Sequence, residues 1–488
     1  MAIQKPSLPK GTRDFGAAEV QKRKYILNTI ETVFKKYGFM PLETPTMENL
    51  STLEGKYGDE GDKLLFRILN SGDAFKDIKE KNANQQVSNV EFKVSDVSEK
   101  GLRYDLTVPF ARYVVMNRNN ITFPFKRYQM QPVWRADRPQ KGRYREFWQC
   151  DADVVGSDSL LNEVDLISIY LEVFNKLFSN LEGGALKFKI KINNRKLLWG
   201  IAKYFNCDND FEKFVGILDK LDKVGINQVS EELKLSGLVN DTNKKLLEPT
   251  ELSYFREGIS QNYAKWLPQI EKLKDTINFN EQNPIGTKGL EELESVLSCF
   301  NPEKDNVELD VYLARGLSYY TGCIFEVIVD DSRCTLKSSI GGGGRYDNLT
   351  GIFGLPHVSG VGISFGLDRI YDVLDELKLF PPQLRASSTA VLFCHLDAAT
   401  QQYCLPALKQ LRDAGIAAEV YPDVVVKKDM GKIKGVQFDY ASALGIPFTA
   451  FAGEQEMAQG VFQVKSLATG AQQVCTIEQL ITLYQQQH

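Results

Sequence analysis

The chain has 488 residues, of which 43% are hydrophobic and 25% are charged, and these values are typical of a globular protein with about two to four domains. No window offers about 18 consecutive apolar residues, and Met1 to Phe15 lacks the apolar core of a signal peptide, so the sequence predicts a cytosolic protein without a membrane span. The formal net charge of −4 excludes a globally basic nucleic-acid binder but allows local basic patches.

The cysteines and histidines narrow the chemistry further. The eight cysteines are scattered without a CxxC pair, which argues against a zinc site and a disulfide framework and predicts reduced, structural thiols. With only three histidines (His357, His395 and His488), histidine-based metal catalysis and a Ser-His-Asp triad have few places to be built. We therefore expect arginines and carboxylates to carry the chemistry.

The first predicted element is a long amphipathic helix over Ala17–Tyr37, where Ile26, Ile30 and Val33 recur at helical spacing and a glycine ends the run. The next segment, FMPLETPTMENL, contains prolines that break a helix. It is predicted to be an extended strand that can join a partner's sheet.

Residues 79–100 are polar and weakly patterned, so we expect a hairpin or loop without chemistry there. The following periodicities predict an antiparallel α+β pattern. Its expected strands cover 102–106, 128–134 and 147–155, and its expected helix covers 160–178.

Residues 206–300 are rich in Lys, Glu and Leu at helical spacing, which predicts a helical insertion that splits the sheet until it resumes at about Val307. The stretch PPQLRASS, residues 381–388, marks a domain boundary. Alternating patterns then predict a small βαβαβ domain of about 100 residues with a mostly parallel or mixed sheet. Its expected strands cover 390–394, 417–420 and 448–451, and its helices 400–414 and 432–444.

The first chemical segment is LARGLSYYTGCIFE, which begins at Leu313 and leads into a predicted strand over 323–329. A guanidinium in a sheet interior must find an anion, because an unpaired buried charge is costly. Arg315 is therefore a candidate to bind a substrate carboxylate or phosphate. The alternative is an edge strand with a solvated arginine.

The second segment, FKRYQMQPVWRADRPQKGRYREFWQCDAD, covers residues 125–153 and predicts two strands joined by a basic loop. Its guanidiniums can hold a polyphosphate by forked hydrogen bonds, and its aromatic residues can face a base. An exposed basic loop is the alternative. The charged residues of the loop are Arg135, Asp137, Arg138, Lys141, Arg143 and Arg145.

The third segment is GVGISFGLDRIYDVL, residues 360–374, a glycine-rich strand that runs into a helix. Small residues let a nucleotide approach the backbone, and Arg369 near the helix start can bind a terminal phosphate. Taken alone, an arginine such as Arg369 is more often a capping or surface residue.

Together, the three segments resemble the class II aminoacyl-tRNA synthetases. The motifs RGLSYYTG and GLRYDLT (101–107) narrow the resemblance to the histidyl-tRNA synthetase family. It extends from KGTRDF (10–15) to the last domain, and no P-loop competes for the nucleotide. The resemblance implies an antiparallel sheet with flanking helices and a homodimer built by the strand after the first helix. It also implies a catalytic domain in residues 1–200 and 306–380, a mostly helical insertion in 201–305, and a C-terminal α/β anticodon-binding domain in 388–488.

The resemblance implies a histidine pocket. Family members hold the α-amino group with residues matched by Asp105, Thr107 and Gln149, all of which can accept ammonium hydrogens. Asp153 and Tyr320 match the imidazole pocket, and Tyr319 and Arg315 belong to the same histidine-binding set.

The resemblance also implies an ATP site with Mg²⁺. Arg135 matches the arginine at the α-phosphate, Arg143 and Arg369 match those at the outer phosphates, Phe147 matches the ring on adenine, and Asp137 belongs to this set. Arg315 matches the additional catalytic arginine. The histidine carboxylate attacks the α-phosphorus in line, without a general base, and the histidyl group then passes to the terminal ribose of tRNA(His). Glu326 is a candidate Mg²⁺ ligand.

Two positions depart from the family pattern. Ser318 stands where many relatives carry aspartate, and Asp153 stands where bacterial relatives often carry glutamate, which shortens the reach to imidazole by one methylene. Basic residues elsewhere are candidate tRNA phosphate contacts, or simply solvated charges. They are Lys187, Lys189, Lys191, Arg195, Lys196, Lys427, Lys428, Lys432 and Lys434.

Two other classes of function remain open. One is a non-catalytic, histidine-sensing paralogue such as the regulatory subunit of ATP phosphoribosyltransferase, which lacks the anticodon-binding domain and the intact motifs. The other is a synthetase-like regulatory part of a stress kinase, although no kinase signature precedes it.

Overall fold

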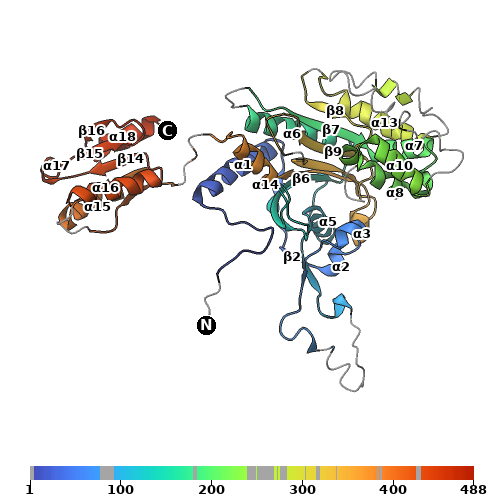
Figure 1. The fold of residues 1–488 in the computed structure, drawn as a ribbon, viewed down its shortest axis with the longest axis horizontal. Helices are drawn as coiled ribbons and strands as arrows, with labels where there is room; N and C mark the ends of the chain where they lie inside the picture. The colour runs from blue at the N-terminus through green and yellow to red at the C-terminus, as the bar shows by residue number, and fades with distance from the viewer. Residues whose placement is uncertain are drawn as a thin grey trace. The chain divides into compact units, whose positions relative to one another are not determined.

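The structure is a computed structural model that forms two compact units, residues 1–13 with 25–379 and residues 14–24 with 380–488 (Figure 1). It describes residues 5–76, 78, 93–179, 184–238, 249, 269–271, 273–274, 283–302, 304–314, 319–336, 338–381, 384, 387–424 and 430–487. Most of the expected polar loop, residues 79–92, lies outside this description.

The first unit is built on an eight-stranded sheet in the order β1-β5-β6-β11-β10-β9-β7-β8. Neighbouring strands are antiparallel except at the two edges, where β1 with β5 and β7 with β8 are parallel. The predicted α+β class is confirmed. The strands are β1 Met40–Pro41, β5 Phe125–Trp134, β6 Glu146–Val155, β7 Phe188–Asn194, β8 Val307–Leu309, β9 Cys323–Val329, β10 Gly341–Tyr346 and β11 Gly360–Gly366.

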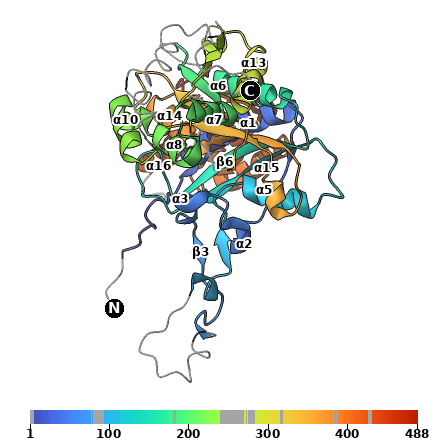
Figure 2. The same ribbon diagram turned by 90° about the vertical axis from the view of Figure 1, so that its right-hand side faces the viewer.

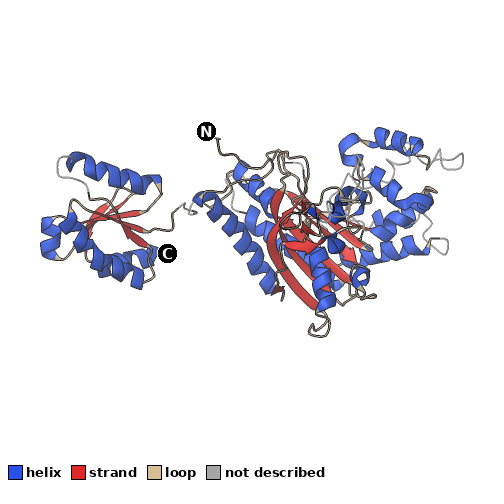
Figure 3. Ribbon diagram, turned by 90° about the horizontal axis from the view of Figure 1, so that it is seen from below, coloured by secondary structure: helices blue, strands red, loops and turns tan. Residues whose placement is uncertain are grey.

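Helices cover one face of this sheet, as the view from below shows (Figure 3). The Phe34 ring of α1 (Ala17–Lys36) lies 5.6 Å from the Tyr128 ring and 5.8 Å from that of Phe365. Phe174 of α6 (Leu161–Phe178) lies 5.4 Å from the same Phe365. Apolar residues at helical spacing therefore form an aromatic core on this face, and the opposite face is left for polar side chains.

A small three-stranded sheet, β2-β4-β3, lies below the main one, near α2 (Figure 2). Two predictions were wrong here. The strand expected through FMPLETPTMENL is split between β1 and β2, which lie in different sheets, because its prolines interrupt the pairing. The strand expected over 102–106 ends at Leu102, and α5 begins at Thr107, where the Val108 amide donates to the Asp105 carboxylate. The elements are β2 Met47–Asn49, α2 Leu50–Leu53, α3 Gly58–Asp62, β3 Arg67–Ile68, η1 Val94–Asp96, β4 Lys100–Leu102 and α5 Thr107–Met116.

Between β7 and β8 the described chain is helical, as expected, and these helices gather beside one end of the sheet (Figure 1). A Cβ on Gly289 would lie 2.4 Å from the backbone nitrogen of Leu197, so only glycine permits this approach of α13 to α7. The helices are α7 Arg195–Tyr204, η2 Asp208–Asp210, α8 Phe211–Leu218, α9 Leu221–Val224, α10 Ile226–Leu235 and α13 Pro284–Leu297.

The second unit contains a mixed five-stranded sheet in the order β13-β12-β14-β15-β16, which confirms the predicted mixed α/β pattern. The first three strands are parallel and the last two are added antiparallel. Its elements are β12 Val391–Cys394, α15 Ala398–Asp413, β13 Ala418–Val420, α16 Met430–Ala443, β14 Phe448–Phe451, α17 Glu454–Gln459, β15 Phe462–Ser466, β16 Gln472–Cys475 and α18 Ile477–Gln487. The sequence did not predict those after β14.

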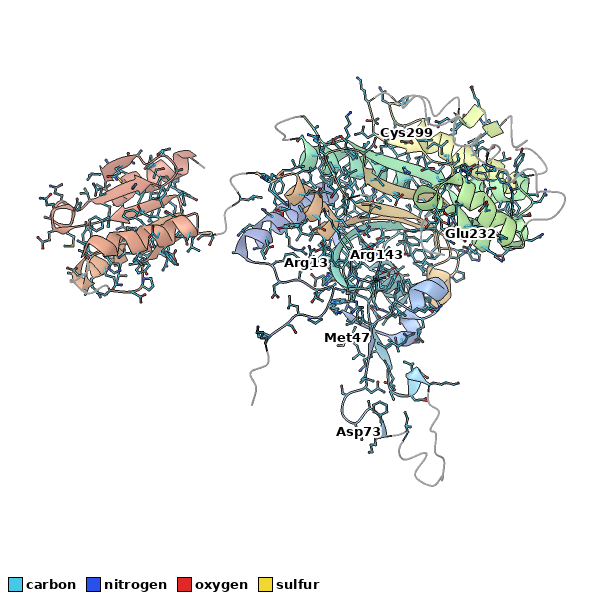
Figure 4. The ribbon with its side chains drawn as sticks, in the orientation of Figure 1. Arg13, Met47, Asp73, Arg143, Glu232 and Cys299 are labelled. Atoms are coloured by element: carbon cyan, nitrogen blue, oxygen red, sulfur yellow. The ribbon has the colours of Figure 1, made fainter. Side chains whose placement is uncertain are left out.

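All eight cysteines are free thiols, and seven of them are buried. Cys299 is exposed (Figure 4). Among the described residues, no group of three or more His, Cys, Asp or Glu side chains is arranged to hold a metal ion. None of the helices in the described part of the chain is long and apolar enough to cross a membrane.

Candidate active site

Two adjoining cavities open on the polar face of the eight-stranded sheet. The larger has a volume of about 350 Å³ and the smaller about 40 Å³. Both lie over the glycine-rich strand β10, where a Cβ on Gly344 would meet the Tyr320 ring at 2.9 Å. The absence of side chains there gives a ligand and the tyrosine access to the backbone. The two cavities share Arg135, Gln149, Tyr320, Gly342, Gly343 and Ser364.

The smaller cavity brings together every described residue predicted to bind histidine. Successive side chains of a strand alternate between faces, so Gln149 and Asp153 on β6 point to the same side. Tyr319 and Tyr320 come from the loop before β9. Thr107 begins α5, and Asp105 lies in the turn before that helix. The residues are Asp105, Thr107, Gln149, Asp153, Tyr319 and Tyr320.

Asp105 is held in place by three donors. Its Oδ1 accepts the Tyr57 hydroxyl and the Val108 amide, both at 3.1 Å, and its Oδ2 accepts the Tyr319 hydroxyl at 3.1 Å. Burial raises the pKa of this carboxyl, while the hydrogen bonds oppose that rise. Sequence reasoning missed Tyr57, which joins this network from a different part of the chain.

Asp153 is also contacted by two side chains, and neither of them was indicated by the sequence motifs. Its Oδ1 accepts the Tyr346 hydroxyl at 2.7 Å, and its Oδ2 lies 2.7 Å from Nη2 of the fully buried Arg127. Burial raises the pKa of the carboxyl, and Arg127 opposes the rise. Asp151 lies between Gln149 and Asp153 on the same face of β6 and lines the same cavity. The alternation of side chains along β6 was the sequence signal that could have identified Asp151 as a cavity residue.

The larger cavity collects the residues predicted to bind ATP. The Arg135 guanidinium lies 4.2 Å from the Tyr104 ring and 5.1 Å from the Phe147 ring, and its Nε donates to the Tyr104 carbonyl at 3.1 Å. Stacking and hydrogen bonding fix it at the junction of the two cavities. The predicted residues that line the larger cavity are Arg135, Asp137, Arg143, Phe147 and Arg369, together with Glu326.

Arg369 links separate segments of this cavity. Its Nε donates to the Gly142 carbonyl at 2.7 Å and its Nη1 to the Ser339 carbonyl at 2.6 Å. It therefore connects α14 (Leu367–Glu376) to the loop after β5 and to the start of β10. Arg369 is half-buried, and its contact with the outer phosphates stays a prediction.

Arg315, together with Gly316, Leu317 and Ser318, lies outside the described residues, so its predicted role stays a prediction. The paired tyrosines that follow it are described. Burial raises the pKa of both Tyr319 and Tyr320, so both remain protonated phenols that can donate a hydrogen bond.

The basic residues proposed as tRNA contacts near β7 are paired within the protein. Lys191 lies 2.8 Å from Asp310, Lys196 2.5 Å from Glu292 and Arg195 2.5 Å from Glu212. Lys189 pairs with Glu308 and Asp330. These four charges lie beside carboxylates of the protein, and their contact with tRNA phosphates stays a prediction. Lys187 is exposed, Lys427 and Lys428 lie outside the described residues, and the side chains of Lys432 and Lys434 are not described.

The N-terminal segment contacts the rim of the larger cavity through Arg13 (Figure 4). Its guanidinium lies 2.6 Å from Asp368, 3.2 Å from Asp372 and 3.5 Å from the centre of the Tyr144 ring. Asp368 in turn accepts the Trp148 amide at 2.8 Å. Arg13 therefore fastens the loop after β5 to α14.

We expect Arg13→Ala to raise KM for ATP about 10-fold, because the residues predicted to bind ATP lose their alignment, and to leave KM for the amino acid unchanged. Steady-state kinetics with each substrate varied in turn measures both constants. Lys10→Ala, an exposed change three residues earlier on the same segment, is the matched control. An unchanged KM for ATP in Arg13→Ala would show that this contact does not position the site.

The chain is similar to known proteins over most of its length. The family model described as histidyl-tRNA synthetase matches residues 74–370, and the model described as anticodon binding domain matches residues 389–487. A protein named histidine–tRNA ligase from Cytophaga hutchinsonii is 49% identical over 98% of this chain and 99% of its own length. Another of that name, from Christiangramia forsetii, is 50% identical over 96% of this chain and 97% of its own.

Solved structures show the same likeness. The histidyl-tRNA synthetase from Nostoc sp. PCC 7120 matches with a TM-score of 0.77 at 27% identity, covering 100% of both chains. A chain from Bacillus halodurans, described as an ATP phosphoribosyltransferase regulatory subunit/histidyl-tRNA synthetase, matches with a TM-score of 0.66, covering 92% of this chain and 100% of its own. At 18% identity, that second match shows a shared fold alone.

Proposed function

The chain belongs to the histidyl-tRNA synthetase family, and from that premise we propose how its residues divide the work of the reaction. It is a class II aminoacyl-tRNA synthetase, a ligase that uses ATP to activate L-histidine as histidyl-adenylate with release of pyrophosphate and then transfers histidine to the 3′ end of tRNA(His). The observation that carries the assignment of residues is that the histidine set and the ATP set line two adjoining cavities that share Arg135.

In the proposed arrangement, the smaller cavity holds histidine with its ammonium group at Asp105, Thr107 and Gln149. Gln149 is suited to this role because its Nε2 donates to Ser364 at 2.9 Å, while its buried Oε1 has no partner among the described residues. The imidazole then points toward Tyr320 and the carboxylates of β6. The histidine carboxylate is left at the junction of the cavities.

ATP fills the larger cavity, with adenine on Phe147 and the outer phosphates near Arg143 and Arg369. The α-phosphate then lies beside Arg135, where the histidine carboxylate attacks it in line and pyrophosphate leaves. Negative charge accumulates on the phosphoryl oxygens, so fixed guanidiniums stabilise the transition state and no general base is required.

Mg²⁺ is proposed to bind with ATP. The buried Glu326 and the nearby Asp137 line the larger cavity and offer the hard oxygen ligands that Mg²⁺ prefers. The described residues contain no cluster of three such ligands, so most of the coordination would come from phosphate oxygens and water. The bound ion would neutralise phosphate charge.

We assign the domains as the sequence suggests: catalytic residues 1–200 and 306–380, an insertion over 201–305, and an anticodon-binding domain over 388–488. A cytoplasmic homodimer is proposed. Support for the dimer comes from exposed apolar side chains beside β1 and β2, where Met40 is 52% and Met47 54% exposed (Figure 4).

The regulatory alternative is not supported by a specific observation. The likeness to the Bacillus halodurans chain is one of fold, whereas the residues assigned to ATP line one cavity and residues 389–487 match an anticodon-binding model.

We expect pyrophosphate exchange with ATP to depend on histidine when each of the twenty amino acids is supplied in turn. In the same assay, Arg315→Ala should lower kcat by about 10²- to 10³-fold, because a donor to the developing phosphoryl charge is removed. Sedimentation velocity should give the same dimer for the variant as for the unaltered chain.

Arg333→Ala, a surface arginine on the loop after β9 that pairs with Asp331, serves as the control. Histidine binding without exchange in the unaltered chain would favour the regulatory function, and full activity in Arg315→Ala would remove the role assigned to Arg315.

A further inference from the structure

The loop that carries the paired tyrosines is bonded to the end of β10 by the residue that follows Tyr320. The Thr321 hydroxyl donates to Asp347 Oδ2 at 2.6 Å and accepts the Asp347 amide at 3.1 Å. The Thr321 amide donates to the Arg345 carbonyl at 2.8 Å. Both polar groups at Thr321 therefore bond to the same segment, which fixes the loop at this point.

The Asp347 carboxylate is itself held from its other side. Its Oδ1 accepts the Ser359 hydroxyl at 2.7 Å, and the Ser359 oxygen accepts Nη1 of Arg345 at 2.5 Å. Arg345 forms a forked pair with Glu163 of α6 at 2.6 and 2.7 Å, and both of these side chains are buried. We call these five residues, Thr321, Asp347, Ser359, Arg345 and Glu163, the loop anchor. It joins the tyrosine loop to β10, to the residue before β11 and to α6.

Two glycines let the loop lie directly on this anchor. A Cβ on Gly322 would lie 2.9 Å from Cδ of Arg345, and a Cβ on Gly344 would lie 2.9 Å from the Tyr320 ring. The Arg345 side chain cannot give way easily, because Glu163 holds its guanidinium. The loop anchor therefore sets the distance between Tyr320 and β10.

The loop anchor has no direct place in the reaction. Thr321 and Asp347 line neither of the two cavities, whereas Tyr320 lines both and the Tyr319 hydroxyl donates to Asp105 at 3.1 Å. The anchor can therefore act on the reaction only through the two tyrosines. The alternative is that it contributes to stability alone.

We propose that Thr321 and Asp347 are positioning residues, which hold Tyr319 and Tyr320 at the histidine pocket through the loop anchor. The proposal rests on the proposed function, because it takes histidine as the occupant of the smaller cavity. Loss of the Thr321 hydroxyl leaves the Asp347 amide and one carboxylate oxygen without this partner. The loop then shifts, and the tyrosines lose their alignment with the bound amino acid.

The first test is Thr321→Val, which keeps the shape of the side chain and removes the hydroxyl. In the exchange assay, KM for histidine should rise about 10-fold. KM for ATP should not change, because the residues assigned to the adenine and the phosphates belong to other segments. Thr321→Ser, which keeps the hydroxyl, should restore the KM for histidine. A contribution to stability alone would reduce the amount of active protein, and thus kcat, without changing either KM.

Thr29→Val is the matched control, because it makes the same change where the hydroxyl bonds only within its own helix, to the Tyr25 carbonyl at 2.9 Å. Both KM values should equal those of the unaltered chain. An unchanged KM for histidine in Thr321→Val, or an equal rise in both KM values, would overturn the proposal.

A second variant tests whether the two positions act together. The Asp347 side chain is 35% exposed, so Asp347→Ala keeps the fold and tests the proposal even if Thr321→Val does not fold. It should raise KM for histidine by a similar factor. The double variant should show no larger rise than Asp347→Ala alone, because both changes remove the same hydrogen bond. Independent, additive effects would reject the coupling that the proposal requires.

If the unaltered chain shows no histidine-dependent exchange, the proposed function fails instead. Calorimetric titration of histidine into the unaltered chain and Asp347→Ala then decides the proposal. Weaker binding by the variant supports it, and equal or absent binding by both rejects it.

Discussion

Replacing Arg135 with alanine is expected to reduce kcat for histidine-dependent exchange by about 10³-fold, with a small change in KM for histidine. Arg135 is the one charged side chain common to both cavities among the described residues. Two aromatic rings and the Tyr104 carbonyl hold it there, so its charge needs no reorganisation when the phosphoryl oxygens become more negative. Single-turnover measurement of adenylate formation isolates this step from product release.

Arg138→Ala is the matched control for this change. Arg138 belongs to the same basic loop but is exposed, and it lines neither of the two cavities. We expect its exchange activity to equal that of the unaltered chain. Equal losses in the two variants would indicate that the loop acts through its overall charge, and the specific position given to Arg135 would be wrong.

Replacing Asp153 with alanine is expected to lower the free energy of unfolding by about 3 kcal/mol, because it leaves a buried guanidinium without its ion pair. Arg127 is fully buried, and its Nε and Nη1 already have no partner among the described residues. We expect a loss of stability at the lower end of the range for breaking a buried ion pair, because the Asp151 carboxyl still lies near Arg127. Urea denaturation monitored by circular dichroism gives the measurement.

The control for this prediction is Asp165→Ala, which removes an ion pair of the same type from a wetter position. The Lys126 and Asp165 side chains are 28% and 41% exposed, and such pairs contribute at most about 1 kcal/mol. If both variants unfold at the same denaturant concentration, the buried pair does not stabilise the catalytic unit in the way we describe.

Much of the fold was predictable because its signals are local. The long first helix, the strand that enters α14 and the alternation of the second unit all follow from periodicity and glycine placement. The predicted secondary structure was wrong where a short strand is followed closely by a turn. β4 stops at Leu102 and α5 begins at Thr107, and the Asp105 side chain accepts a backbone amide of that helix, an interaction that periodicity does not reveal.

The residues that line the cavities were also predictable in part. Arg135, Phe147 and Arg369 were found because their segments carry recognisable patterns, and the structure places all three around one cavity. The sequence could not show that Lys189 and Lys191 form ion pairs, because their partners Glu308 and Asp310 are more than a hundred residues away in sequence and are brought close by the pairing of β7 with β8.

The sequence by itself determined the family, the order of the motifs and the kinds of side chain available for the reaction. Only the tertiary structure decided which of those side chains are already occupied. Asp151 and Asp153 have the same chemistry and lie on the same face of one strand, yet the Tyr346 hydroxyl of β10 donates to Asp153, and the Arg127 guanidinium of β5 lies 2.7 Å from it. The difference arises from strand register, because register sets which donors from distant segments reach each carboxylate.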